Sequence, residues 1–180
     1  MDTLNPRIAV YPGTFDPLTN GHVSLTNRAC EIFDTVILAI ANDSSKKTLF
    51  SLEERVEIAK ETFAEQPKVQ VESFSGLTVD FASKCGAMVL LRGLRAVSDF
   101  EYEFQLALLN RKLEQKIQTL FLMTDSQWLF ISSSIIKSAA SLGGDIKELV
   151  PVASFKRLRK AYGYEDSPEN LTDMLQSQGK

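Results

Sequence analysis

Short apolar runs alternate with amphipathic stretches along most of the chain. Residues 8–10, 36–41 and 87–91 are continuous apolar runs, which predict strands that are covered on both faces. Between these runs, apolar positions recur at helical spacing and predict helices over residues 23–33 and 52–63. The chain therefore alternates strand and helix from its start.

The second half of the chain continues this alternation. Residues 69–71 alternate apolar and polar positions and predict a strand nearer a sheet edge, and residues 120–122 predict a fifth strand. A short helix is predicted over residues 78–84, closed by Gly86 at its C-terminus. Five strands alternating with helices predict an α/β fold with a doubly wound, five-stranded parallel sheet of Rossmann-like type.

The domain boundaries follow from the last predicted helices. These lie over residues 135–142 and from residue 150, and the composition turns polar from Gly163. We expect a single domain over residues 1–162. The tail over residues 163–180 is expected to be either a short helix or disordered.

The helix predicted from Ser98 to about Leu113 is apolar on more than one side. Phe100 and Phe104 lie on one stripe, and Leu109 lies with Leu113 on another. Such a helix is too apolar for one core face, which favours burial against a neighbouring subunit. Burial within its own domain fits the pattern equally well, so both readings stay open.

Composition excludes several classes of function. A net charge of -3 over 180 residues gives no bulk electrostatic basis for binding nucleic acid or an anionic membrane. No apolar stretch is long enough to span a bilayer, and the first residues do not resemble a signal peptide. Cys30 and Cys85 are far apart and are expected to be buried thiols. We expect a cytoplasmic protein.

Polar residues with phosphate-binding chemistry follow four of the predicted strands. The turn over residues 11–22 follows the first strand and ends on His22, the only histidine. Lys46 and Lys47 follow the second strand, Arg92 and Arg95 the fourth, and Ser132, Ser133 and Ser134 the fifth. Ligands of open α/β sheets bind beyond the carboxyl ends of the strands, so these residues are expected to share one rim.

The chemistry of this rim favours a polyphosphate ligand. It has one histidine, several cations and the N-termini of helices, whose free N–H groups attract anions. It has no histidine beyond His22 for a nucleophile triad, no Cys/His metal cluster and no Walker A loop. Nucleotidyl transfer needs mainly in-line positioning and neutralisation of charge at phosphorus, and this set of groups supplies both.

Longer motifs narrow the prediction. The string YPGTFDPLTNGH over residues 11–22 resembles the T/HxGH signature of the nucleotidylyltransferase superfamily, and its full length resembles the bacterial phosphopantetheine adenylyltransferase family. The strings NDSSKK at 42–47, RGLRAVSDFEYE at 92–103 and ISSSIIK at 131–137 are similar to segments of that family in the same order. The sequence differs from the common family pattern at two places. Trp128 stands where tyrosine often begins the last segment, and residues 76–78 are not the residues most common in the family.

The resemblance implies a fold, a reaction and a set of site residues. The reaction would transfer the adenylyl group of ATP to 4′-phosphopantetheine, giving dephospho-coenzyme A and pyrophosphate without a covalent intermediate. The implied catalytic residues are His22, Thr14, Lys46 and Arg95, with His22 stabilising the transition state. The implied ATP-binding residues are Thr14, Phe15, His22, Gly93, Leu94, Arg95, Glu103, Trp128, Leu129, Phe130, Ile131, Ser132, Ser133 and Ser134. The implied phosphopantetheine-binding residues are Thr14, Lys46, Thr78 and Arg92.

The resemblance also implies partners and leaves alternatives. It implies Mg²⁺ as the partner of ATP, a homohexamer and inhibition by coenzyme A at the same cleft; the sequence offers no dedicated carboxylate cage for the metal, although Asp16 is near the turn. Lys46 and Lys47 can also be read as a solvated pair, the three serines as a helix cap and Glu103 as a surface charge. Competing functions are a sister nucleotidylyltransferase acting on nicotinamide mononucleotide and a non-catalytic nucleotide-binding regulator.

Overall fold

The computed structural model describes residues 4–164 except 44, 46 and 96. The strands and helices in chain order are β1 (Asn5–Gly13), α1 (Asn20–Ile32), β2 (Thr35–Ala41), α2 (Leu52–Thr62), β3 (Val69–Phe74), α3 (Thr78–Lys84), β4 (Ala87–Leu94), α4 (Val97–Leu113), β5 (Gln118–Met123), the 3-10 helix η1 (Ser126–Trp128), α5 (Ser133–Ser141) and α6 (Val152–Ala161).

The five strands form one parallel sheet in the order β3-β2-β1-β4-β5. The chain first winds outward from β1 to β3 and then returns to place β4 on the other side of β1. This reversal confirms the predicted doubly wound α/β fold, and β3 lies at an edge as its alternating pattern predicts. The switch between β1 and β4 opens a crevice at their carboxyl ends, where such folds bind ligands.

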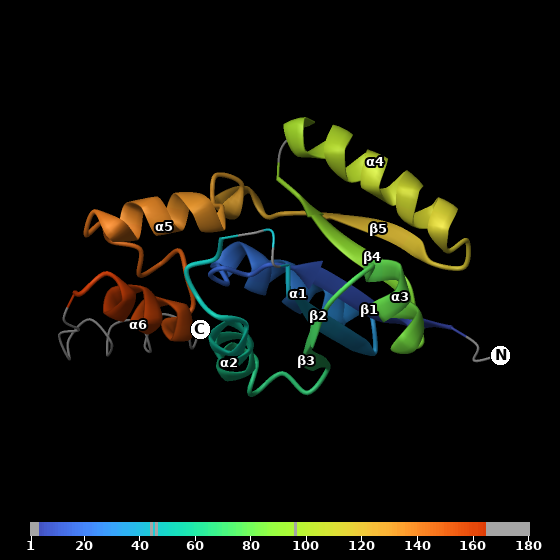
Figure 1. The fold of residues 1–180 in the computed structure, drawn as a ribbon, viewed down its shortest axis with the longest axis horizontal. Coiled ribbons are helices and arrows are strands. Elements are labelled where there is room, and N and C mark those ends of the chain that lie inside the picture. The colour runs from blue at the N-terminus through green and yellow to red at the C-terminus, as the bar shows by residue number, and fades with distance from the viewer. Residues whose placement is uncertain (1–3, 44, 46, 96, 165–180) are drawn as a thin grey trace.

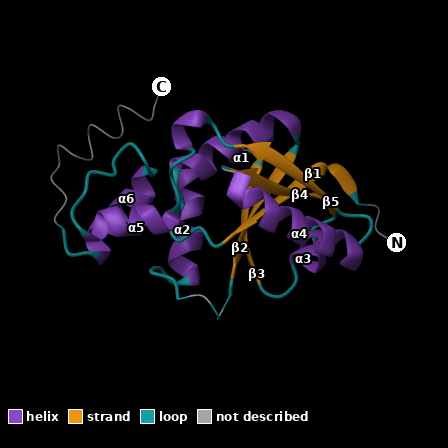
Figure 2. Ribbon diagram, turned by 90° about the horizontal axis from the view of Figure 1, so that it is seen from above, coloured by secondary structure: helices purple, strands orange, loops and turns teal. Residues whose placement is uncertain are grey.

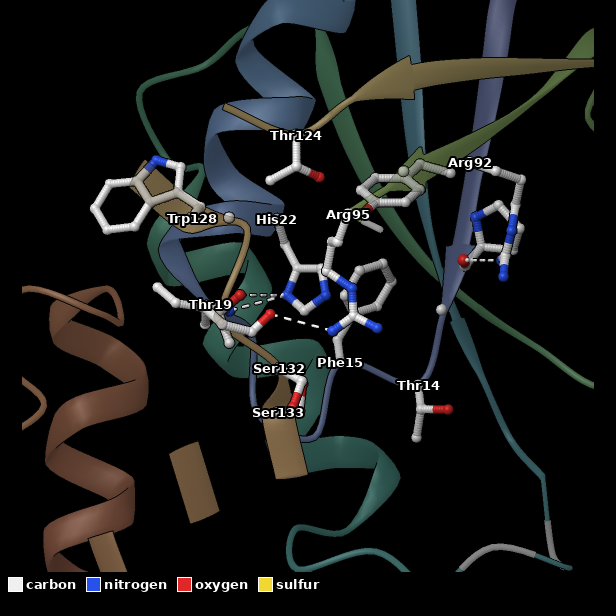
Figure 3. A pocket seen from close by; sticks show the side chains of 16 residues that line it. Thr14, Phe15, Thr19, His22, Arg92, Arg95, Thr124, Trp128, Ser132 and Ser133 are labelled. Carbon is white, nitrogen blue, oxygen red and sulfur yellow. Dashed lines mark hydrogen bonds between the residues drawn. The ribbon is translucent and has the colours of Figure 1, made fainter. Parts of the chain in front are cut away.

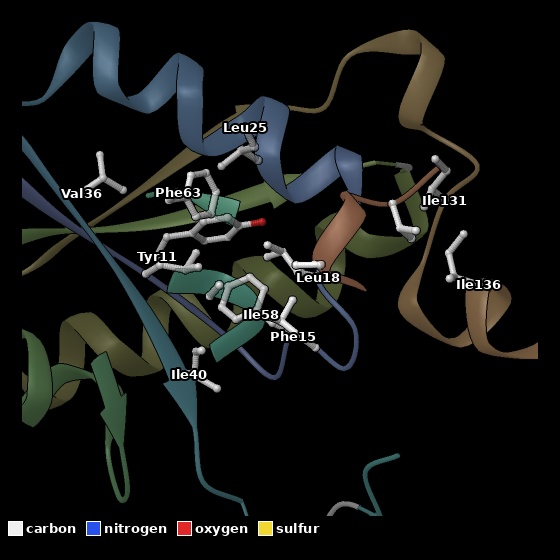
Figure 4. Packing of buried hydrophobic residues seen from close by; sticks show 14 of the residues in the cluster. Tyr11, Phe15, Leu18, Leu25, Val36, Ile40, Ile58, Phe63, Ile131 and Ile136 are labelled. Atoms are coloured by element: carbon white, nitrogen blue, oxygen red, sulfur yellow. The ribbon is translucent and has the colours of Figure 1, made fainter. Parts of the chain in front are cut away.

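Helices cover both faces of the sheet (Figures 1 and 2). On one face, side chains of α3 pack on alternate positions of the strands, such as Val10 and Ile37. On the other face, α1, α2, α5 and α6 enclose a larger apolar cluster that includes Tyr11, Phe15 and Leu18 (Figure 4). Because Phe15 and Leu18 belong to this core, the turn that follows β1 is anchored in it rather than free in solvent.

Two boundaries differ from the sequence-based expectation. Helix α1 begins at Asn20 and places His22 inside its first turn, with Thr19 as the N-cap, whereas the pattern predicted a start at residue 23. Strand β4 continues to Leu94, so Arg92 lies within the strand rather than after it. The periodicity missed both extensions because Asn20 and Arg92 are polar. The helix or disorder predicted within residues 165–180 lies outside the described residues.

Helix α4 leaves large apolar side chains exposed. Phe100, Phe104, Leu108, Leu109 and Leu113 are each about half exposed, and the neighbouring strand β5 exposes Leu120 and Met123. The chain itself therefore covers only about half of the surface of these apolar side chains. Within the described part of the chain, no helix is both long and apolar enough to cross a membrane. The two cysteines are free thiols: Cys30 is buried and Cys85 is partly buried.

Candidate active site

A cleft of about 300 Å³ opens at the carboxyl ends of β1 and β4 (Figure 3). Its walls come from the turn after β1, the start of α1, the end of β4 and the segment from β5 to α5. The residues that line it are Tyr11, Pro12, Gly13, Thr14, Phe15, Thr19, Gly21, His22, Arg92, Gly93, Arg95, Thr124, Trp128, Ile131, Ser132 and Ser133.

His22 is held in the cleft by the cap of its own helix. The backbone N–H of Thr19 donates to His22 Nδ1 at 3.0 Å, and the Thr19 hydroxyl lies 2.9 Å from the same nitrogen. This is a capping box in which the third helical residue is histidine in place of the usual glutamate. Because Nδ1 accepts a hydrogen bond from an amide, the ring proton belongs on Nε2. The helix cap therefore sets the imidazole tautomer.

His22 is neutral at physiological pH. Burial, and secondarily the nearby charge of Arg95, lower the pKa of His22 from 6.5 to about 4. The Nε2 atom makes no hydrogen bond to the residues that the structure describes, and it belongs to a side chain that lines the cleft. His22 therefore presents a neutral N–H donor to a ligand, which suits a phosphoryl oxygen.

Arg92 is engaged from two sides. Its Nε and Nη2 donate to the two carboxylate oxygens of Glu103 at 2.7 and 2.5 Å, and its Nη1 donates to the Pro12 carbonyl at 2.9 Å. Burial alone would lower the pKa of Arg92, but the Glu103 hydrogen bonds raise it. The guanidinium is thus fixed in orientation and permanently charged, and two of its five N–H bonds are left for a ligand.

A second, smaller cavity lies on the other side of Arg92. It has a volume of about 80 Å³ and shares Pro12 and Arg92 with the main cleft. Its other walls are Thr78, Leu90, Glu103, Leu106, Ala107, Asn110 and Thr119. Arg92 therefore stands between a cleft rich in donors and a smaller cavity with both apolar and polar walls.

The N-terminus of α5 faces the main cleft. The Ser132 hydroxyl caps this helix by accepting from Ile135 N–H, and the Ser133 hydroxyl donates to the Pro17 carbonyl at 2.8 Å. Both hydroxyls thus have structural partners. Of the first helical turn, the backbone N–H groups of Ser133 and Ser134 remain as the donors that an anion would use. Arg95 adds a cation beside them, and its Nη1 donates to Ile131 O at 3.1 Å.

Asp16 joins three segments beneath the cleft. It is 4% exposed, and its carboxylate accepts from the N–H groups of Leu49 and Phe50, each at 2.9 Å, and from Lys137 Nζ at 2.5 Å. These contacts tie the turn after β1 to the segment that precedes α2 and to α5. Because its oxygens are occupied in this way, Asp16 is a poor candidate for a metal ligand.

The structure brings most of the predicted site together. Thr14, Phe15, His22, Arg92, Gly93, Arg95, Trp128, Ile131, Ser132 and Ser133 line the main cleft, and Thr78 and Glu103 line the smaller cavity. Leu94, Leu129, Phe130 and Ser134 line neither cavity; Phe130 is 61% exposed. Lys46 lies outside the described residues.

Sequence reasoning missed several lining residues. Tyr11 is one of them: burial raises the pKa of its hydroxyl, which therefore stays protonated as a donor. Thr124 follows β5 directly, and this strand-end position was a usable signal. Thr19 belongs to the motif but was not predicted as a site residue. In the smaller cavity, Asn110 and Leu106 come from the helical face of α4, which was interpreted only for packing.

Fold and site together define a class of enzyme. A neutral histidine donor, two arginines and a helix N-terminus converge on one cleft at the switch point of a parallel sheet, an arrangement suited to transfer at a phosphate. In agreement, residues 10–139 match the family described as cytidylyltransferase-like. The protein is a nucleotidyltransferase of that class.

Curated relatives identify the branch within this class. A phosphopantetheine adenylyltransferase from Nitratidesulfovibrio vulgaris is 65% identical over 91% of this chain and 88% of the relative. The enzymes of the same name from Oleidesulfovibrio alaskensis and Moorella thermoacetica are 62% and 56% identical, over 91% and 88% of this chain and 96% and 99% of their own lengths. The chain belongs to the phosphopantetheine adenylyltransferase family.

A solved structure supports the fold independently. A Vibrio parahaemolyticus protein assigned as a nicotinate-nucleotide adenylyltransferase superposes with a TM-score of 0.64. The match covers 84% of this chain and 97% of that chain at 19% sequence identity. At this identity the likeness concerns the fold alone.

Proposed function

We propose that this enzyme transfers the adenylyl group of ATP to 4′-phosphopantetheine, which is a step of coenzyme A synthesis. A phosphate oxygen of phosphopantetheine attacks the α-phosphorus of ATP, the bond to the bridging oxygen of the β-phosphate breaks, and pyrophosphate leaves. The products are dephospho-coenzyme A and pyrophosphate. The observation that carries the proposal is that Arg92 lines both a donor-rich cleft and a smaller cavity beside it, because the reaction needs two adjoining substrate sites.

His22 acts at the α-phosphate. As charge builds on the phosphoryl oxygens in the transition state, the neutral Nε2–H donates to one of them, and Thr19 holds the ring in place. Thr14, at the opposite wall of the cleft, orients the attacking phosphate. No proton has to leave His22 for the transfer, since the attacking group is already an anion.

The acceptor binds across Arg92. The two remaining N–H bonds of Arg92, together with Lys46, bind its phosphate. The pantetheine arm then runs into the smaller cavity, where Thr78 and Asn110 offer polar contacts beside the apolar side chains of Leu90 and Leu106. The two hydrogen bonds that Arg92 donates to the Glu103 carboxylate keep the guanidinium in the orientation that this phosphate requires.

ATP occupies the main cleft. Its triphosphate binds at the N-terminus of α5 and beside Arg95, where free backbone N–H groups and a cation lie together. Gly93, Leu94 and the segment of residues 128–134 hold the adenosine. Mg²⁺ enters with ATP on the phosphate oxygens, where it neutralises charge; among the described residues, no cluster of His, Cys, Asp and Glu forms a cage for it.

The active form is proposed to be a homohexamer in the cytoplasm. The exposed apolar face of α4 and β5 supports self-association, because single chains rarely leave a patch of this kind in water. Light scattering would test the hexamer, which has a mass of about six times 20.1 kDa. Coenzyme A carries the same pantetheine arm as the acceptor and is proposed to inhibit by occupying the same two cavities.

An acceptor panel tests the proposed function. Purified enzyme is incubated with ATP, Mg²⁺ and either 4′-phosphopantetheine or nicotinamide mononucleotide, and pyrophosphate release is followed. We expect the higher kcat/KM with 4′-phosphopantetheine. A higher value with nicotinamide mononucleotide would support a sister activity, and nucleotide binding with no pyrophosphate release from any acceptor would support a regulator.

A further inference from the structure

Arg55 is a buried arginine that reaches from α2 to the turn after β1. It is 3% exposed, and its Nη1 donates to the Thr14 carbonyl at 2.8 Å and to the Ala41 carbonyl at 3.0 Å. Its Nε donates back to the Ser51 carbonyl at 3.2 Å. One side chain thus joins the residue proposed to orient the attacking phosphate to the carboxyl end of the neighbouring strand β2.

The charge of Arg55 has no direct counter-ion in the described part of the chain. Its hydrogen bonds go to backbone carbonyls, and Asp16 and Glu53 act on it only at a distance. Burial lowers the pKa of this guanidinium from its usual value, in opposition to those two carboxylates. A buried cation without an ion pair costs free energy, so packing alone does not explain an arginine at this position.

The segment between β2 and α2 is fixed at its far end as well. Asp16 accepts from Leu49 and Phe50, as described above, and Arg55 holds Ala41. Asp16 directly follows Phe15, and Arg55 reaches the carbonyl of Thr14, which directly precedes it. The contacts that fix both ends of the segment therefore lie on either side of Phe15. Phe15 has a φ of 48°, a left-handed conformation that is strained for a residue other than glycine. External contacts such as these are needed to keep the backbone in that state.

We propose that Arg55 is a positioning residue for the acceptor phosphate. By holding the Thr14 and Ala41 carbonyls together, it sets the distance between Thr14 and the segment that follows β2. Its charge also adds to the attraction for an anion at Thr14. This inference rests on the proposed function, because it assumes that the acceptor phosphate binds at Thr14.

The test compares Arg55→Lys and Arg55→Met with the unaltered enzyme. For each protein, kcat/KM for 4′-phosphopantetheine is measured at saturating ATP, and the Kd for ATP is measured by calorimetry without acceptor. We expect kcat/KM for the acceptor to fall by about 10- to 100-fold in Arg55→Met, because a small displacement of the reacting groups lowers the rate by this order of magnitude. Arg55→Lys retains the charge and one donor nitrogen, so its kcat/KM should fall less than that of Arg55→Met. The Kd for ATP should stay within about threefold in both variants.

Arg157→Met is the matched control. Arg157 also contacts α2, through Glu57 and Glu61, but on the outer surface and away from Thr14. This variant should leave both quantities within about twofold. The inference is overturned if acceptor and ATP parameters change in parallel with melting temperature, if Arg55→Met keeps its acceptor kcat/KM, or if neither Arg55 variant folds. Absence of turnover in the unaltered enzyme would instead refute the proposed function.

Discussion

The imidazole of His22 and the backbone N–H of Thr19 form a hydrogen bond of 3.0 Å that directs the other ring nitrogen to the cleft. In the proposed mechanism this contact couples the start of helix α1 to catalysis, because the same cap that begins the helix fixes the tautomer of the only histidine. A donor prepared in this way needs no reorganisation when charge develops on the α-phosphate.

Replacing His22 should therefore affect rate more than binding. For His22→Ala we expect kcat to fall by about 100- to 1,000-fold, the loss typical of one removed transition-state donor. The KM values should change only a few-fold, since the contact strengthens in the transition state. Steady-state kinetics and ATP calorimetry provide the measurement. A loss of ATP affinity as large as the loss of rate would show that His22 is a binding residue.

The lowered pKa of His22 predicts a pH dependence of stability. The unfolded chain takes up a proton on His22 near pH 6.5, whereas the folded chain does so only near pH 4. Between these values the unfolded state binds more protons, so this contribution is complete above pH 6.5 and is lost as the pH falls to about 4. Urea unfolding at several pH values should show the unaltered protein losing more stability than His22→Ala in this window. Parallel curves for the two proteins would contradict the prediction.

Arg92 should contribute to the acceptor more than to ATP. For Arg92→Ala we expect the KM for 4′-phosphopantetheine to rise by about 10- to 100-fold, in line with the loss of charged hydrogen bonds, with a smaller change for ATP. This variant leaves Glu103 as an unpaired, largely buried carboxylate. The double variant Arg92→Ala with Glu103→Ala removes that charge and serves as the control. If the KM for ATP rises more than the KM for 4′-phosphopantetheine in both variants, Arg92 binds a phosphate of ATP and the proposed assignment of the two phosphate sites is wrong.

The Asp16–Lys137 pair should be structural rather than metal-binding. Asp16→Asn leaves Lys137 without its buried partner and should lower the free energy of unfolding by about 3 kcal/mol. Lys137→Met should show strong coupling to it in a double-mutant cycle. The Mg²⁺ concentration that gives half-maximal activity should remain unchanged in Asp16→Asn. A large shift in that concentration would place Asp16 at the metal after all.

Gly93 lies directly against the side chain of Leu25. A Cβ atom built on Gly93 would lie 2.5 Å from Leu25 Cδ1, which is far inside van der Waals contact. We expect Gly93→Ala to cost about 1–3 kcal/mol through overpacking. Adding Leu25→Val shortens the opposing side chain and should restore part of the melting temperature. If the second change restores nothing, the requirement for glycine at this position has another cause.

The sequence was a good guide to the fold because buried parallel strands carry a strong signal. The apolar runs at residues 36–41 and 87–91 became β2 and β4, and the alternating run at 69–71 became the edge strand β3. The rules for connections between parallel strands then leave only a few possible strand orders. Polar strand ends and caps carried less signal, which is why Arg92 and the first turn of α1 were placed outside their elements.

Pairings within the site were harder to predict than its location. Strand ends converge on one rim for topological reasons, so the sequence located His22 and both arginines. Which partner each side chain takes depends on distances that spacing does not reveal. Arg92 donates to Glu103, and the Ser133 hydroxyl donates to the Pro17 carbonyl. For Arg92 and Ser133 the sequence predicted only contacts with a ligand. The burial of Arg55 and its contacts with the turn after β1 could not be predicted, because position 55 lies within an ordinary amphipathic helix.

The most direct test of the account is the stereochemistry at the transferred phosphorus. One diastereomer of ATP bearing sulfur on its α-phosphate is converted with 4′-phosphopantetheine, and the configuration of the thio-substituted dephospho-coenzyme A is determined. A single in-line attack predicts release of pyrophosphate with inversion at phosphorus. Retention would require an intermediate on the enzyme, and failure to form the adenylylated product would contradict the assignment of the two cavities.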